Sequence, residues 1–198
     1  MKKDIDAIFD INTMSTASLR KDHDLIEKVI KAMESTIQLL VDGKQIPESI
    51  LLPVIDFSKN FTDVCHHSKE ENSLFPALEQ AGMPRNMGPI AMMLMDHERS
   101  REIGKHMEES SKEYLSSGNS ENLISDMKQY VEHITEHLWK ENNRLFMMAE
   151  ARLQYVSEKV DKELNEIEQS KLKETGKTRE HYEKLVETLT NDVSEHGA

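Results

Sequence analysis

The stretch Met127–Met148, MKQYVEHITEHLWKENNRLFMM, decides the fold. Its apolar residues recur every three or four positions, which is the period of one face of an α-helix. His137 and Glu141 lie on that same face, four residues apart, so one helix presents an imidazole and a carboxylate to the core. The stretch therefore predicts an amphipathic helix with metal-ligating groups on its buried side. The positions on this face are Met127, Tyr130, Ile134, His137, Glu141, Leu145 and Met148.

Three earlier segments have the same helical period, and turns rich in Gly, Pro or Ser separate all four. Each amphipathic segment needs neighbours to cover its apolar face, and short connections favour antiparallel neighbours. We therefore predict an all-α protein, an antiparallel up-down four-helix bundle with additional C-terminal helices. The three earlier segments run from Thr16 to Leu40, from about Glu48 to Phe75 and from about Pro89 to Tyr114.

The charge and helical pattern divide the chain into three parts. Residues 1–15 are expected to form an N-terminal extension, and residues 16–152 the four-helix bundle. Beyond Arg152 the chain is more charged but keeps helical spacing, with an interruption at Gly176. Residues 153–198 are therefore predicted to be a C-terminal helical extension packed on the bundle.

The composition excludes several classes of protein. The 198 residues carry 37 acidic and 25 basic side chains, a net charge of -12, which disfavours nucleic-acid binding by a broad basic surface. The single cysteine, Cys65, excludes an intrachain disulfide and a multi-thiolate metal site. The longest apolar stretches fall far short of the roughly 20 residues that span a bilayer, and no signal peptide is recognisable. We expect a cytoplasmic protein that binds neither nucleic acid nor membrane.

Four predicted helices each bring a histidine to the apolar side, and two of them add a glutamate four residues later. A lone histidine at such a position is usually a hydrogen-bonded core residue. Several imidazoles and carboxylates at matching depths are different, because burying them is costly unless they are paired or bind a metal ion. We therefore predict one metal site in the bundle core. Its predicted ligands are His23, His66, Glu70, His97, His137 and Glu141.

The second helix offers two registers, because His67 and Glu71 have the same spacing as His66 and Glu70. At roughly 100° per residue, His66 lies beside the apolar stripe and His67 points nearly opposite, so we select His66 and Glu70.

Two residues of the fourth helix lie near the predicted site. His133 is one turn before His137 and is either a fifth imidazole ligand or, as we favour, a hydrogen-bonding partner outside the ligands. Tyr130, on the same stripe, is a candidate outer partner or a packing residue.

The predicted ligands narrow the choice of metal. Imidazoles and carboxylates without thiolate suit iron, manganese or zinc, and two carboxylates able to bridge point to a di-iron centre. None of the nine histidines follows a glutamate by three positions, so the ferritin-type motif is missing. A zinc-protease motif is missing too, because His97-Glu98 is followed by Arg99, Ser100 and Arg101.

The motifs around these ligands resemble the signatures of the hemerythrin-like, or HHE cation-binding, family. The resemblance covers about Thr16 to Leu189 and implies a four-helix bundle that holds two iron ions, with an oxo or hydroxo bridge. It implies that the four histidines are terminal ligands and that Glu70 and Glu141 bridge. The motifs are HHSKEENSLFP (66–76), MDHE (95–98) and HLWKENNRLF (137–146), with His23-Asp24 in the first helix.

Two differences separate the chain from the oxygen-carrying members. Arg101 stands where carriers have a second histidine in the third helix. In the fourth helix, carriers have an aspartate five residues after the histidine, whereas Glu141 follows His137 by four. Both differences favour the branch that includes iron-centre repair proteins. Four terminal imidazoles, two for each iron, leave an open position for a small ligand and make the centre easier to dismantle.

The leading hypothesis is a protein that binds or reacts with O2, NO or peroxide, in sensing, scavenging or stress response, with an electron-donor protein as partner. The alternative is an iron donor or store for damaged iron centres, with an iron-acceptor protein as partner. A third interpretation is a structural helical module whose polar core fixes packing. Whether the protein is an enzyme stays open, because no residue identifies a site for a reductant.

Overall fold

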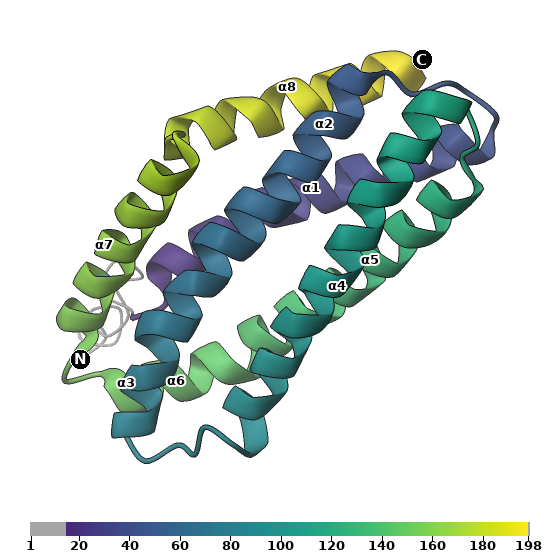
Figure 1. Ribbon diagram of the computed structural model, residues 1–198. Coiled ribbons are helices and arrows are strands. Elements are labelled where there is room, and N and C mark those ends of the chain that lie inside the picture. Colours follow the sequence, from purple (N-terminus) through teal and green to yellow (C-terminus); the bar gives the residue numbers. More distant parts are fainter. Residues whose placement is uncertain (1–14, 198) are drawn as a thin grey trace, which may run out of the picture.

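The computed structural model describes residues 15–197, and these residues form helices joined by short turns, without a strand (Figure 1). The prediction of an all-helical protein is confirmed. Four long helical rods lie side by side, and two further helices follow them. The rods are α1 (Ala17–Val41); α2 (Glu48–Asp56) continued by η2 (Phe57–His67), η3 (Glu70–Leu74) and α3 (Phe75–Gln80); α4 (Gly88–Ser117); and α5 (Glu121–Lys140) continued by η4 (Glu141–Leu145) and α6 (Phe146–Leu153).

The second and fourth rods contain π-helical turns, which are the segments η2, η3 and η4. A π-helix bonds each residue to the fifth along the chain, so its turn is wider than that of an α-helix. Such turns occur frequently at functional sites. Here they lie at the two His-x-x-x-Glu motifs, and they change the direction of the side chains there.

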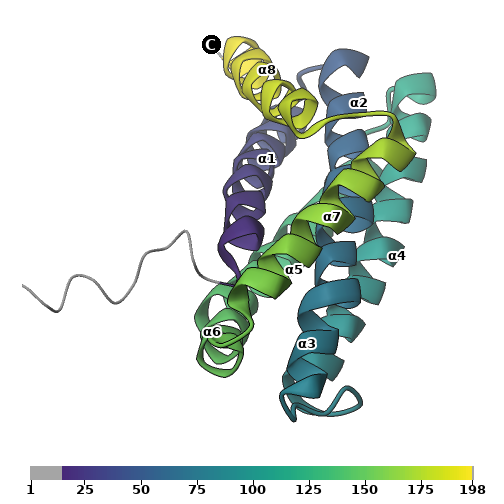
Figure 2. The same cartoon turned by 90° about the vertical axis from the view of Figure 1, so that its left-hand side faces the viewer.

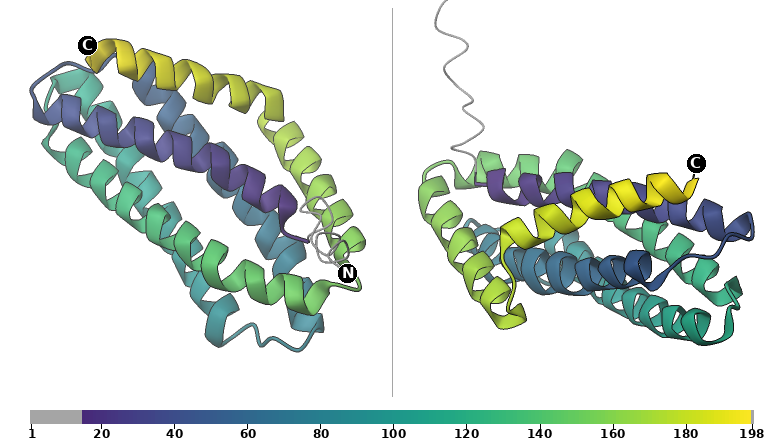
Figure 3. Two further views of the ribbon diagram at one scale, coloured as in Figure 1. Left: turned by 180° about the vertical axis from the view of Figure 1, so that it is seen from behind. Right: turned by 90° about the horizontal axis from the view of Figure 1, so that it is seen from above.

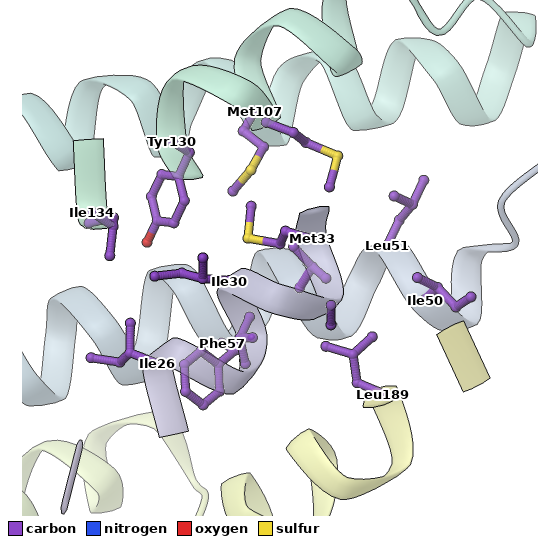
Figure 4. Packing of buried hydrophobic residues seen from close by; sticks show 14 of the residues in the cluster. Ile26, Ile30, Met33, Ile50, Leu51, Phe57, Met107, Tyr130, Ile134 and Leu189 are labelled. Atoms are coloured by element: carbon purple, nitrogen blue, oxygen red, sulfur yellow. The ribbon is translucent and has the colours of Figure 1, made fainter. Parts of the chain in front are cut away.

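The hydrophobic core consists of two clusters. The larger joins α1, α2, η2, α4, α5 and α8, and Figure 4 shows Ile30 and Met33 of α1 facing Tyr130 and Met107 within it. The smaller gathers side chains from the opposite ends of the rods, around Phe75 and Phe146. On each rod the predicted histidine ligand lies between a residue of one cluster and a residue of the other. The two apolar clusters therefore enclose the polar site from both ends.

The last two helices, α7 (Ser157–Thr175) and α8 (Arg179–Gly197), pack on the rods (Figures 2 and 3). Helix α8 lies along α1 and also contacts α2, while α7 contacts η2, η3 and α1. Tyr182 is fully buried, with its ring centroid 5.1 Å from that of Phe61 and 5.8 Å from that of Phe57. Gly176, with φ of 70°, adopts the left-handed conformation that ends α7 and turns the chain into α8.

Two further predictions concern the N-terminal extension and the absence of a membrane-spanning helix. The predicted N-terminal extension falls on residues 1–14, outside the described residues, apart from Ser15. Within residues 15–197, none of the helices combines the length and the apolar character that crossing a bilayer requires.

Candidate metal centre

The structure brings the six predicted ligands together in the centre of the four rods, and all six are buried. These side chains form overlapping groups. In each group, every residue offers one nitrogen or oxygen atom, and these atoms lie within 4.8 Å of one another. One group contains His23, His66 and Glu141, and a second contains Glu70, His97, His137 and Glu141. A third contains His67, His97 and His137. The third group adds the imidazole of His67, which was not among the predicted ligands.

Glu141 lies between the imidazoles of two rods. Its Oε2 is 3.2 Å from Nε2 of His23 in α1, and its Oε1 is 3.3 Å from Nε2 of His137 in α5. Glu70 likewise reaches two rods, since its Oε2 is 3.2 Å from Nε2 of His97 and 3.9 Å from Nε2 of His66. Each carboxylate thus faces imidazoles on two sides.

Within residues 15–197, the polar atoms at the centre of the site form no hydrogen bonds of good geometry, although they lie close to one another. Among the buried side chains of the described residues, the five Nε2 atoms and the four carboxylate oxygens form no hydrogen bond. Each unsatisfied buried polar atom costs about 1–3 kcal/mol, so a protein rarely keeps many in one place. Imidazole nitrogens and carboxylate oxygens are the donors that iron, manganese and zinc accept. These residues therefore fit a metal site, and they are His23, His66, His67, His97, His137, Glu70 and Glu141.

The outward-facing Nδ1 atoms of four of these histidines have hydrogen-bond acceptors. An acceptor at Nδ1 holds the proton on that nitrogen and leaves the lone pair of Nε2 directed inward, as a metal ligand requires. Four of the Nδ1 atoms lie at hydrogen-bonding distance from an acceptor, and the fifth is farther. The pairs are His23 with Asn142 at 3.0 Å, His66 with Asp22 at 3.2 Å, His67 with Asp63 at 3.2 Å, His97 with Glu71 at 2.7 Å and His137 with Asp96 at 3.6 Å.

The outer carboxylates are in turn paired with cations. Arg101 donates to Asp63 at 2.8 Å and to Glu71 at 2.7 Å, so one guanidinium supports the acceptors of both His67 and His97. Burial raises the pKa of Glu71, but its hydrogen bonds with His97 and Arg101 outweigh burial and hold this pKa at about 2. Arg101 is therefore connected to the site through two hydrogen-bonded carboxylates.

The other two outer carboxylates have the same arrangement. Lys69 donates to Asp22 at 2.8 Å and Lys140 donates to Asp96 at 2.9 Å. Burial raises the pKa of Asp22, but the positive charge of Lys69 lowers it. The resulting pKa lies well below the usual range. Burial raises the pKa of Asp96, but the neighbouring His137 and the hydrogen bond from Lys140 outweigh burial and lower it. These acceptors stay ionised at neutral pH.

The imidazoles and carboxylates of the centre shift one another's pKa. Burial lowers the pKa of His97, but the adjacent Glu70 and Glu71 outweigh burial and raise it to about 9. Burial, with the His97 charge, lowers the pKa of His67 well below its usual value. Burial raises the pKa of Glu141, but the positive charges of His137 and His23 outweigh burial. The pKa of Glu141 therefore lies well below its usual range. Glu141 is therefore held in its anionic form.

The prediction that His67 points nearly opposite to His66 is wrong. Its side chain is buried, and its ring stacks on that of His97 with centroids 3.9 Å apart. The prediction assumed the 100° step of an α-helix, whereas residues 57–67 form π-helical turns with a smaller step for each residue. His66 and His67 can therefore both face the centre. Asp63, four residues before His67, is the acceptor of its Nδ1 and was the available signal in the sequence.

Neither of the two outer candidates belongs to the ligand groups found in residues 15–197. His133 pairs through Nε2 with the main-chain oxygen of Asp96 at 2.9 Å and joins none of the ligand groups found in residues 15–197. Tyr130 belongs to the larger apolar cluster, and burial raises its pKa to about 12. With Ser58 and His67, Tyr130 lines a pocket of about 280 Å³.

Comparison with known proteins agrees with the geometry of the site. Residues 14–149 match the family model described as the hemerythrin HHE cation binding domain, and this range includes every residue of the centre. No match was found among curated proteins or among solved structures. The matched range covers well over half of the chain, so the protein belongs to the hemerythrin HHE cation-binding family.

Proposed function

We propose that this chain is a non-haem di-iron protein that binds or reacts with O2, NO or peroxide, in sensing, scavenging or stress response. The observation that supports the proposal best is the position of Glu141, whose two oxygens approach imidazoles on opposite sides. A carboxylate placed in this way can be shared by two ions. The family supports metal binding, because its domain is a cation-binding one.

We assign one ion to His23 and His66 and the other to His67, His97 and His137, with Glu70 and Glu141 shared and an oxo or hydroxo bridge between the ions. This replaces the expectation of two imidazoles for each ion. The ion with two imidazoles has fewer protein ligands, which leaves room for a small exogenous molecule. When bound, iron supplies one-electron chemistry that the side chains cannot provide.

The chain's own residues supply orientation and exclusion of water. The apolar clusters at both ends of the site restrict solvent, which strengthens electrostatic interactions inside it. The carboxylate acceptors of His66, His67 and His97 favour the proton on the outer nitrogen of each ring. The ligands are thus oriented before any ion enters, so binding costs less conformational entropy.

We also infer that the four rods run up, down, up and down. Short turns join them in order, and neighbouring rods such as α4 and α5 or α1 and α5 are in contact. The cytoplasmic location and the protein partners, an electron donor or an iron acceptor, stay predictions.

The alternative function, an iron donor or store, rested partly on a missing fifth imidazole. His67 supplies a fifth imidazole at the centre, so that reason for easy dismantling no longer applies. Membership of the iron-centre repair branch likewise stays a prediction. The site therefore favours binding of a small ligand over donation of iron.

The proposal is tested by metal analysis together with absorption spectroscopy. Protein loaded with ferrous iron without oxygen is expected to contain two irons per chain. On exposure to air it should gain charge-transfer absorption bands in the near-ultraviolet and visible range. If neither air nor NO changes the spectrum, the proposed ligand binding is contradicted. A content of one iron per chain, or none, would contradict the di-iron assignment.

A further inference from the structure

Four charged side chains form a closed ring where the C-terminal helices meet the bundle. Lys69 Nζ lies 2.8 Å from Oδ2 of Asp22 and 2.7 Å from Oε2 of Glu168. Arg179 Nη1 lies 2.7 Å from Oδ1 of Asp22 and 3.0 Å from Oε2 of Glu168. The members come from α1, the second rod, α7 and the first residue of α8, so the ring joins the extension to the bundle (Figure 2).

The ring is largely buried, and its charges alternate in sign. Asp22 and Lys69 have no exposed side-chain surface, and Arg179 is only 26% exposed. The three ammonium donors of Lys69 have three acceptors, because the hydroxyl of Ser18 lies 2.6 Å away in addition to the two carboxylates. Buried ion pairs are often no better for stability than apolar residues of the same size. A role beyond stability is therefore worth seeking.

The ring touches the metal centre at a single point. Oδ2 of Asp22, which accepts from Lys69, is also 3.2 Å from Nδ1 of His66. Asp22 is thus the acceptor that orients His66, and two cations on Asp22 determine how strongly it attracts the imidazole proton. A more negative acceptor makes an imidazole a stronger electron donor to its metal ion. The charges of the extension can therefore reach the ion through Asp22 and His66.

We propose that Glu168 and Arg179, in the C-terminal extension, are positioning residues for His66 and that the net charge of the ring sets the reduction potential of the centre. The inference rests on the proposed di-iron function. It assigns the extension a part in the metal chemistry although Glu168 and Arg179 lie beyond the segment that matches the family model.

The proposal predicts opposite effects from neutralising the two residues. Arg179→Met leaves the ring with one extra negative charge, which favours the oxidised, more positive centre and lowers its reduction potential. Glu168→Gln leaves one extra positive charge and raises the potential. The double variant restores the neutral ring and should return the potential most of the way to the parent value. A purely structural role would shift both single variants in the same direction.

The measurement is a redox titration of the iron-loaded full-length chain, followed by its absorption bands, with iron per chain determined in each sample. Lys177→Met is the matched control, because it removes another ion pair between the extension and the bundle, with Asp56, at similar exposure and away from Asp22. Arg179→Lys keeps the charge and should stay near the parent potential. Arg179→Gln replaces Arg179→Met if that variant does not fold.

The outcomes separate the two proposals. Shifts of opposite sign in the single variants, with an unchanged control, support the role of the ring. If the single variants retain parental iron content but have the parent's reduction potential, or shift it in the same direction, the role of the ring is overturned. The proposed di-iron function is unaffected by that result. A parent chain that binds no stoichiometric iron would overturn the proposed function itself, and this inference with it.

Discussion

His67 and His97 stack face to face, with ring centroids 3.9 Å apart and planes inclined by 12°. Two imidazolium rings could not remain this close without strong repulsion, and burial together with the His97 charge accordingly lowers the pKa of His67. Both Nε2 atoms point to the same buried centre without a hydrogen-bond partner among the described residues. One cation bound by both nitrogens, as proposed above, would satisfy the two lone pairs at once.

His67→Ala is expected to remove one of the two irons, because His67 belongs to the group with three imidazoles. Iron per chain, measured by elemental analysis, should fall from two towards one. His106→Ala, on the exposed surface of α4, is the control and should retain both irons. Parental iron content in His67→Ala would show that His67 is not a ligand.

Glu141→Gln keeps the shape of the side chain and removes the charge that faces both groups of imidazoles. Because a carboxylate shared by two ions contributes to both, we expect iron affinity to fall at least ten-fold at both positions. Competition with a coloured chelator measures the loss. Glu136→Gln, an exposed position on the same rod, is the control. An equal affinity in the two variants would exclude a shared carboxylate at residue 141.

The metal-free protein should lose stability as the pH rises above neutrality. The pKa of His97 is raised from 6.5 to about 9, so its stabilising contribution is complete below about pH 6.5 and is lost as the pH rises through about 9. At about 1.4 kcal/mol per pKa unit, the loss is at most about 3.5 kcal/mol. Urea unfolding at pH 6.5 and 9.5 measures it. His97→Gln should show a smaller dependence, and an identical dependence would contradict the assignment.

Iron should stabilise the fold, because it satisfies buried nitrogens and oxygens that otherwise have no partners. Ligand at a thousand times its dissociation constant stabilises a protein by about 4 kcal/mol. The midpoint of thermal unfolding is therefore expected to rise by several degrees on loading and to return on chelation. A His66→Ala and His97→Ala double variant should show little of this rise. A midpoint that iron does not change in the parent would indicate a polar core that serves packing alone.

The sequence could predict the rods and most of the site because both follow the α-helical period. His23, His97 and His137 lie in regular α-helix, where the spacing of apolar residues places the side chains correctly. The predicted direction of the His67 side chain was wrong because the apolar pattern does not reveal the π-helical turns of η2. The ring of Asp22 and Arg179 could not be predicted either, since it joins residues 157 positions apart through the packing of α8.

The most direct test of the central claim is the crystal structure of the iron-loaded protein, with iron located by its anomalous scattering. The account predicts two iron peaks on opposite sides of the Glu141 carboxylate, one near His23 and His66 and the other near His67, His97 and His137. A single peak, or a centre without iron in crystals grown with excess iron, would contradict the account.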